Sequence, residues 1–122
     1  AFEQVCLSHI PQIKQALGIN GTQTNISSWS VKGDMDKRGA QIDLVIDRAD
    51  RIIDLCEMKF TEGLFAITKD YAEWLRERKD IFRESTKTRK TLHTVLVTTW
   101  GLQQNSYAGT VQKAVTMDDL FK

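Results

Sequence analysis

The sequence has little of what marks several classes of protein. Its 122 residues include one proline and two cysteines, and no apolar run approaches the roughly 20 residues that a membrane-spanning helix needs. No membrane partner is therefore expected. Cys6 and Cys56 lie in apolar stretches, which indicates buried free thiols and a reducing, cytoplasmic location. The net charge is only +1, so binding of nucleic acid would have to depend on a local basic patch.

The composition that is present is that of an ordinary folded domain. Hydrophobic residues make up 41% of the chain and charged residues 27%, which suits one modest core rather than a disordered segment. We expect residues 1–122 to form a single domain. The opening residues Ala1-Phe2-Glu3-Gln4 are typical neither of a signal peptide nor of a natural start, so we interpret the chain as a piece of a longer protein.

Hydrophobic periodicity predicts helices and strands in the order αβββαβ. We expect an amphipathic helix over 2–17 that Pro11 bends or splits, strands over 26–32, 40–47 and 52–60, a helix over 68–86, a strand over 92–99, a short edge strand over 110–116 and a terminal helical turn over 117–121. The short turn at 48–51 makes the strands on either side an antiparallel hairpin. The helix over 68–86 joins two parallel strands. The sequence therefore predicts an α/β domain with a mixed β-sheet flanked by helices.

Ionisable side chains interrupt the two apolar strands of this hairpin. Because side chains alternate along a strand, Glu57 and Lys59 share one face. Pairing around the 48–51 turn brings Asp43 opposite or diagonal to Glu57. The alternative is a Glu57–Lys59 salt bridge with Asp43 facing solvent. Asp47 and Asp54 are expected to face the turn or the solvent.

Two neighbouring carboxylates in a half-buried setting repel each other and favour a bound cation. We expect Asp43 and Glu57 to hold Mg²⁺ (or Mn²⁺), because this ion takes one or two carboxylates together with waters and phosphate oxygens. Lys59 would then orient the attacking water and stabilise negative charge on a phosphate. This set of groups suits hydrolysis of a phosphodiester.

The element order and these residues together resemble the PD-(D/E)XK superfamily, whose restriction-endonuclease-like fold is shared by restriction enzymes, junction resolvases and repair exonucleases. Asp43 in QIDLVID and Glu57-x-Lys59 in CEMK carry the resemblance and are 14 positions apart. It implies a restriction-endonuclease-like αβββαβ core and a nuclease-type site at these residues. Glu3 matches the acid that many members carry in the first helix. One departure is the absence of proline before Asp43, where Gln41-Ile42 stand instead.

A second resemblance covers nearly the whole chain. The segments HIPQIKQALGI, GAQIDLVIDRADRIIDLCEMKF, TKDYAEWLRERKDIFRESTKTRKTLHTVLVTTWGL and VTMDDLF are similar to the C-terminal region of a group of bacterial P-loop (AAA-type) ATPases of unassigned role. The resemblance implies an N-terminal ATPase domain in the same protein as a partner. The chain itself contains no G-x-x-x-x-G-K-[ST] motif, so it should not bind ATP by that route.

Basic residues recur along one side of the helix predicted over 68–86 and the segment that follows. They are Lys69, Arg76, Lys79, Arg83, Lys87 and Lys90, and they fall within an arc of about 80° at 100° per residue. This pattern is typical either of a solvated helix with ion pairs to its adjoining acids or of a face that follows the phosphates of nucleic acid, most simply DNA. Nothing in the pattern reads bases.

Aromatic residues give a weaker signal. The helix over 68–86 is expected to bury a stripe made of Tyr71, Trp74, Leu75, Ile81 and Phe82. Trp29, Trp74 and Trp100 are more typical of core residues than of base-stacking platforms. Trp100 directly follows the strand over 92–99 and is the best candidate for exposure.

Three functions remain open on the sequence alone. The first is a metal-dependent nuclease that uses Glu3, Asp43, Glu57 and Lys59. The second is a catalytically silent module of the same fold that recognises nucleic acid or protein and regulates the ATPase. The third is a protein-interaction domain that uses the acidic arc of the helix over 68–86.

Overall fold

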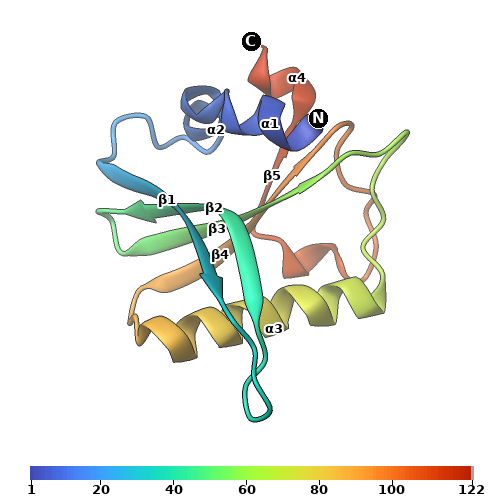
Figure 1. Ribbon diagram of the computed structural model, residues 1–122. Coiled ribbons are helices and arrows are strands. Elements are labelled where there is room, and N and C mark those ends of the chain that lie inside the picture. Colours follow the sequence, from blue (N-terminus) through green and yellow to red (C-terminus); the bar gives the residue numbers. More distant parts are fainter. Residues whose placement is uncertain (122) are drawn as a thin grey trace.

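Over residues 1–121, which are those that the computed structural model describes, a five-stranded sheet lies between two layers of helices (Figure 1). The strands are β1 (Thr24–Val31), β2 (Ala40–Arg48), β3 (Ile52–Lys59), β4 (Thr91–Thr98) and β5 (Lys113–Thr116), in the spatial order β1-β2-β3-β4-β5. Strands β1, β2 and β3 are antiparallel neighbours, whereas β3, β4 and β5 run parallel. The predicted α/β class and mixed sheet are therefore confirmed.

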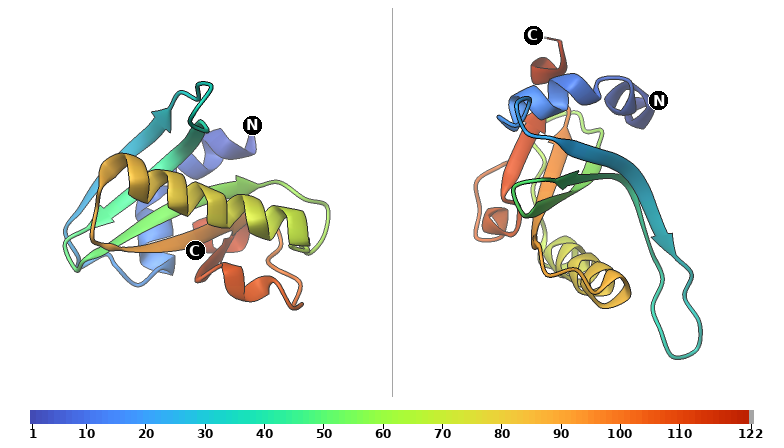
Figure 2. Two further views of the ribbon diagram at one scale, coloured as in Figure 1. Left: turned by 90° about the horizontal axis from the view of Figure 1, so that it is seen from below. Right: turned by 90° about the vertical axis from the view of Figure 1, so that its left-hand side faces the viewer.

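The helices are divided between the two faces of the sheet (Figures 1 and 2). Helices α1 (Phe2–Leu7), α2 (Ile10–Ala16) and α4 (Met117–Leu120) cover one face, α3 (Lys69–Thr86) covers the other, and a 3₁₀ turn η1 (Ala108–Thr110) precedes β5. The helix expected over 2–17 is split rather than bent. Pro11 lies in the first turn of α2, where a proline costs no helical hydrogen bond. Within residues 1–121 no helix has the length and apolar character needed to cross a bilayer.

Helix α3 is held at both ends by local contacts. The Thr68 hydroxyl accepts a hydrogen bond from the Tyr71 amide at 3.1 Å, which caps the first turn. The helix ends at Lys87, whose φ is 60°. Leu75 and Phe82 are buried as expected, together with Ala72. The expected stripe is wrong at Trp74, which is 36% exposed, because this ring packs along the helix rather than against the sheet.

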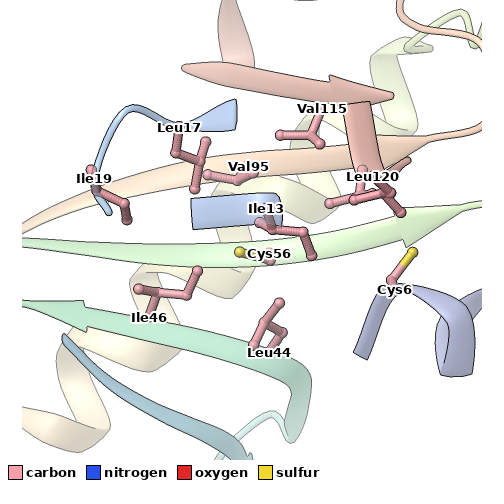
Figure 3. Packing of buried hydrophobic residues seen from close by; sticks show 11 residues of the cluster. Cys6, Ile13, Leu17, Ile19, Leu44, Ile46, Cys56, Val95, Val115 and Leu120 are labelled. Atoms are coloured by element: carbon pink, nitrogen blue, oxygen red, sulfur yellow. The ribbon is translucent and has the colours of Figure 1, made fainter. Parts of the chain in front are cut away.

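Each face of the sheet has its own apolar cluster. Beneath α1, α2 and α4, side chains from four strands pack against the helices (Figure 3), and the buried members are Cys6, Ile13, Leu17, Ile19, Leu44, Ile46, Cys56, Val95, Val97, Val115 and Leu120. Beneath α3 the buried members are Ile42, Val45, Ile53, Leu55, Phe82 and Leu92. Both cysteines are buried free thiols, as predicted. The α3 cluster fixes which face of β3 carries the odd-numbered residues.

Strands β1 and β2 form an arm that extends past α3 (Figure 2). The two segments of the arm approach each other closely near its tip. A Cβ atom added at Gly33 would lie only 2.7 Å from the Gly39 nitrogen. Arg38 near the tip forms an ion pair with Glu77 of α3. The arm is therefore tied to the helix that crosses the same face of the sheet.

The arm leaves the sheet at a bulge in β2. Ser27 pairs with Val45 and Trp29 pairs with Ile42, so two residues of β2, Asp43 and Leu44, stand opposite a single residue of β1. A bulge of this kind bends its strand and re-aims a side chain. Its effect is visible in the packing, since Ile42 and Val45 lie in the same cluster beneath α3 although an odd number of positions separates them.

Candidate active site

Strand β3 supplies two of the predicted site residues. Ile53 and Leu55 are in the cluster beneath α3, so alternation places Glu57 and Lys59 on the same face. Both side chains are half-buried. Glu57 and Lys59 also lie next to β4, with Leu96 and Thr98 as their parallel partners. The predicted arrangement of Glu57 and Lys59 is therefore found.

Strand β2 supplies Asp43 at the point where β2 and β3 separate. The last β2–β3 pair at this end is Leu44 with Cys56, and the next residues along the two strands are Asp43 and Glu57. The bulge coincides with this fork. Asp43 is half-buried and accepts a hydrogen bond from Gln41 Nε2 at 2.8 Å. The carboxylates of Asp43 and Glu57 consequently face one opening at the edge of the β2–β3 ladder.

Helix α1, which packs on β3, brings Glu3 to the same opening. The pKa of Glu3 is raised by partial loss of solvation and by the Asp43 carboxylate, with which it also shares a side-chain hydrogen bond. Glu3 and Asp43 therefore behave as an interacting pair rather than as two independent surface acids.

Glu57 is the most perturbed carboxyl of the group. Its pKa is raised to about 7, chiefly by burial and also by Asp43 and Glu3, whereas Arg78 and Lys59 oppose the shift. Near neutral pH this side chain is close to half protonated. A cation bound beside it would favour the ionised form. The charges of Glu3, Asp43 and Lys59 thus all influence the pKa of Glu57. This electrostatic coupling indicates that the four sequence-predicted residues lie near one another.

The donor set fits a divalent cation of the hard type. Within residues 1–121, no group of three or more His, Cys, Asp or Glu side chains forms a ready metal cage. Mg²⁺ does not need such a cage, because it commonly binds one or two carboxylates and keeps several waters. Asp43 and Glu57 are two such oxygen donors whose mutual repulsion a cation would relieve. Glu3 would then act from outside, through a water.

Arg78 of α3 is a site residue that the sequence prediction missed. Burial lowers its pKa, and the Glu57 carboxylate counters that effect. Its Nε atom is buried without a hydrogen-bond partner in the part of the chain that the structure describes. The signal was present in the sequence, because Arg78 is three residues after Leu75 and four before Phe82, so it interrupts the buried stripe of α3.

A stack of side chains along α3 forms the wall beside Glu57. The Arg78 guanidinium lies 3.4 Å from the centroid of the Trp74 ring, and Trp74 stacks on Tyr71 with centroids 5.3 Å apart. Lys59 Nζ lies 4.9 Å from the Tyr71 centroid. The pKa of Tyr71 is raised by burial and by Glu57. This stack contacts both Lys59 and Arg78, the two cations that oppose the rise in the pKa of Glu57.

The basic residues predicted to contact nucleic acid divide into two groups. Lys69, Arg76 and Lys87 are exposed. The other three make contacts within the fold: Lys79 Nζ donates to Gln112 Oε1, the Arg83 guanidinium donates to the carbonyls of Thr88 and Lys90, and Lys90 Nζ pairs with Asp47 Oδ1. Nucleic-acid binding by this set stays a prediction, and it rests chiefly on the exposed group.

Asp54 was expected to face the turn or the solvent, and that expectation is wrong. Its side chain is 1% exposed, and Arg48 Nη1 donates to Asp54 Oδ2 at 3.2 Å. His93 Nδ1 lies 3.9 Å from Asp54 Oδ1. Burial raises the pKa of Asp54, whereas Arg48 and His93 oppose the shift. The residue could be placed inside only because Arg48, six positions earlier, folds back across the hairpin to neutralise it.

Comparison with known proteins supports the fold alone. No protein-family model and no curated protein matches the chain. A crystal structure of a protein of unknown function, AF1548, is similar over 95% of this chain with a TM-score of 0.60 and 17% sequence identity. The chain spans 64% of the length of that structure. The likeness agrees with a mixed α/β domain, and the restriction-endonuclease-like core stays a prediction.

Proposed function

We propose that this domain hydrolyses phosphodiester bonds of nucleic acid, most simply DNA, with Mg²⁺ or Mn²⁺ as cofactor. The observation that carries the proposal is the convergence of three carboxyl groups and one lysine at the fork of β2 and β3, where Glu57 has a pKa of about 7. The proposal also rests on the resemblance of Asp43 and Glu57-x-Lys59 to the PD-(D/E)XK superfamily. In that context the domain is a nuclease unit attached to a P-loop ATPase.

Each residue has a role that follows from its position. Asp43 and Glu57 supply the oxygen ligands, and a divalent cation held there would supply positive charge for phosphate oxygens and lower the pKa of a nearby water. The Lys59 ammonium, held by the Tyr71 ring, orients the attacking water and stabilises charge developing on the phosphate. Glu3 accepts a hydrogen bond from a water at the rim. Arg78 keeps Glu57 in place by its charge.

The test is cleavage of single-stranded, double-stranded and branched DNA in Mg²⁺ or Mn²⁺. Asp43→Ala and Lys59→Ala should each lower the rate by about 10²-fold or more, which is the usual loss when one charge-stabilising group is removed. Lys113→Ala changes an exposed lysine of β5 and serves as the control, with an unchanged rate. A well-folded wild-type chain that cleaves none of these substrates would count heavily against the proposal.

A second candidate is a silent module of the same fold that regulates an attached ATPase. The electrostatic interaction of Glu57 with Arg78 favours it, because an internal cation already offsets part of the Glu57 charge. Calorimetry with Mn²⁺ separates the two functions. Binding of Mn²⁺ that is lost in Asp43→Ala supports the nuclease, whereas no binding, with full ATPase regulation retained in Asp43→Ala, supports the module.

A further inference from the structure

Exposed apolar side chains gather on the two loops that leave β3 and β4. Phe60, which directly follows β3, is 68% exposed, and Trp100, two residues after β4, is 61% exposed. Leu64 between them in sequence is 59% exposed. Because β3 and β4 are parallel and Lys59 pairs with Thr98, both loops begin at the carboxyl-terminal ends of these strands. Lys59 of the candidate active site lies at the same end.

These loops are held in place by hydrogen bonds. The Thr61 amide donates to Thr99 Oγ1 at 3.0 Å, and the Phe65 amide donates to the Gly101 carbonyl at 2.8 Å. The Gly101 amide donates in turn to Thr98 Oγ1 at 2.8 Å. The rings of Phe60 and Trp100 are therefore presented on a fixed frame, so their exposure costs little ordering when a ligand binds.

Phe60 is connected to the candidate active site from two directions. It directly follows Lys59, the last residue of β3, and its ring lies 5.7 Å, centroid to centroid, from the ring of Phe2. Phe2 directly precedes Glu3 in α1. The Phe60 ring therefore lies on the side of the sheet covered by α1, the helix that contains Glu3, whereas Lys59 packs on Tyr71 of α3 on the other side; both lie at the same end of β3.

Trp74, near the same site, differs from Phe60 because its ring is packed against other side chains of the protein. Its ring is stacked on Tyr71 and lies against the Arg78 guanidinium, so its faces are used within the protein. Phe60 contacts only the tilted ring of Phe2 among the ring contacts recorded within residues 1–121. The two aromatic groups therefore differ in function: one fixes the site and the other is open to a ligand.

We propose that Phe60 and Trp100 stack unpaired bases, which makes single-stranded nucleic acid or an unpaired end the substrate of this domain. The inference rests on the proposed function. A nucleic-acid strand alternates phosphates with flat bases, and the end of the sheet where β3 and β4 finish has both a lysine, Lys59, and two exposed rings, Phe60 and Trp100. Bases within a duplex are stacked on one another and have no free face for such a ring.

Binding and cleavage test the proposal separately. Fluorescence anisotropy in Ca²⁺, in place of Mg²⁺, measures affinity for a labelled thymidine 15-mer and for a blunt-ended hairpin duplex, and cleavage of both is followed in Mn²⁺. Phe60→Ala and Trp100→Ala should each weaken binding of the 15-mer by between about 5-fold and about 150-fold, the usual effect of removing one stacking ring. Phe60→Trp should retain the affinity. Met35→Ala, at the fully exposed tip of the β1–β2 arm, should change nothing.

The outcomes distinguish this inference from the proposed function. Ring-dependent binding of the 15-mer without any cleavage supports the stacking surface and counts against the nuclease. Metal-dependent cleavage that prefers the duplex and is unchanged in Phe60→Ala and Trp100→Ala supports the nuclease and overturns the stacking surface. Self-association that Phe60→Ala abolishes, with unchanged affinity for the 15-mer, would assign the rings to a protein interface and would also overturn the inference.

Discussion

Strand β3 contains two buried acids three positions apart, and the protein treats them in opposite ways. Asp54 lies fully inside and has its own cation, because the Arg48 guanidinium donates to it from the other strand of the hairpin. Glu57 lies half-buried where the hairpin opens, and its neighbours include two more acids, Asp43 and Glu3. The same strand thus contains a neutralised acid at one end and a crowded group of acids at the other.

The difference between Asp54 and Glu57 distinguishes a carboxylate that stabilises the fold from one that is available to bind a cation. A buried carboxylate that is matched within the chain contributes to a specific fold and needs nothing from outside. Carboxylates that are turned towards one another destabilise the empty protein, so their arrangement is useful only when a cation arrives. Four changes to the protein test this comparison.

Removing the partner of Asp54 should have the largest effect. In Arg48→Met the carboxyl of Asp54 stays buried without its ion pair, and we expect the free energy of unfolding to fall by about 3–5 kcal/mol. Urea denaturation measures the change. In the double variant Arg48→Met with Asp54→Asn, part of the loss should be recovered. A loss below about 1 kcal/mol in Arg48→Met would mean that the two ends of β3 do not differ as described.

Addition of Mn²⁺ should stabilise the candidate active site and leave the Asp54 end unaffected. A ligand that binds only the folded chain adds about 2.7 kcal/mol at 100 times its dissociation constant. Thermal unfolding with and without Mn²⁺ should show this gain in the wild type and in Asp54→Asn, but not in Asp43→Asn. An equal gain in all three would place the ion elsewhere.

The metal-free protein should lose stability as the pH rises from about 4.5 to about 7. The pKa of Glu57 is raised from 4.5 to about 7 in the fold, so the folded state holds a proton that the unfolded state has released. The contribution is fully present below the unfolded pKa and is lost as the pH passes the folded value. In the wild type, the free energy of unfolding should fall by an amount on the order of 2 kcal/mol over this pH range, and in Glu57→Gln this fall should be absent. Chemical denaturation at several pH values measures it, and identical pH profiles for wild type and variant would contradict the pKa.

The basic residues of α3 and of the segment that follows it should show the smallest effects, and of two kinds. Arg76→Ala should leave stability unchanged and reduce the dependence of DNA affinity on salt by roughly one phosphate contact, a slope of about 0.7–0.9. Lys90→Ala removes the ion pair with Asp47 and should lower stability by less than about 1 kcal/mol. Titrations at several salt concentrations and urea denaturation separate the two. A salt slope unchanged in Arg76→Ala would remove α3 from the proposed binding face.

The sequence predicted the elements of this fold and the antiparallel β2–β3 hairpin, at whose open end Asp43 and Glu57 lie, because both depend on local rules. Alternation sets the face of Glu57 and Lys59, and a short turn sets the register of the hairpin. The burial of Asp54 and the role of Arg78 were not predicted, since each depends on a partner brought near by the fold. The bulge at Asp43 was also missed, because an extra residue in a strand leaves no compositional mark. That the site has nuclease activity stays a prediction.

The bulge has a mechanical consequence for the candidate active site. Asp43 lies where the β1–β2 arm joins the sheet, and the far end of the arm is fastened to α3 by Arg38 and Glu77. Glu57, by contrast, is held beside Leu96 of β4. The same bulge that bends β2 into the arm therefore also sets the direction of the Asp43 side chain, so the course of the arm and the geometry of the carboxylate group have one structural origin.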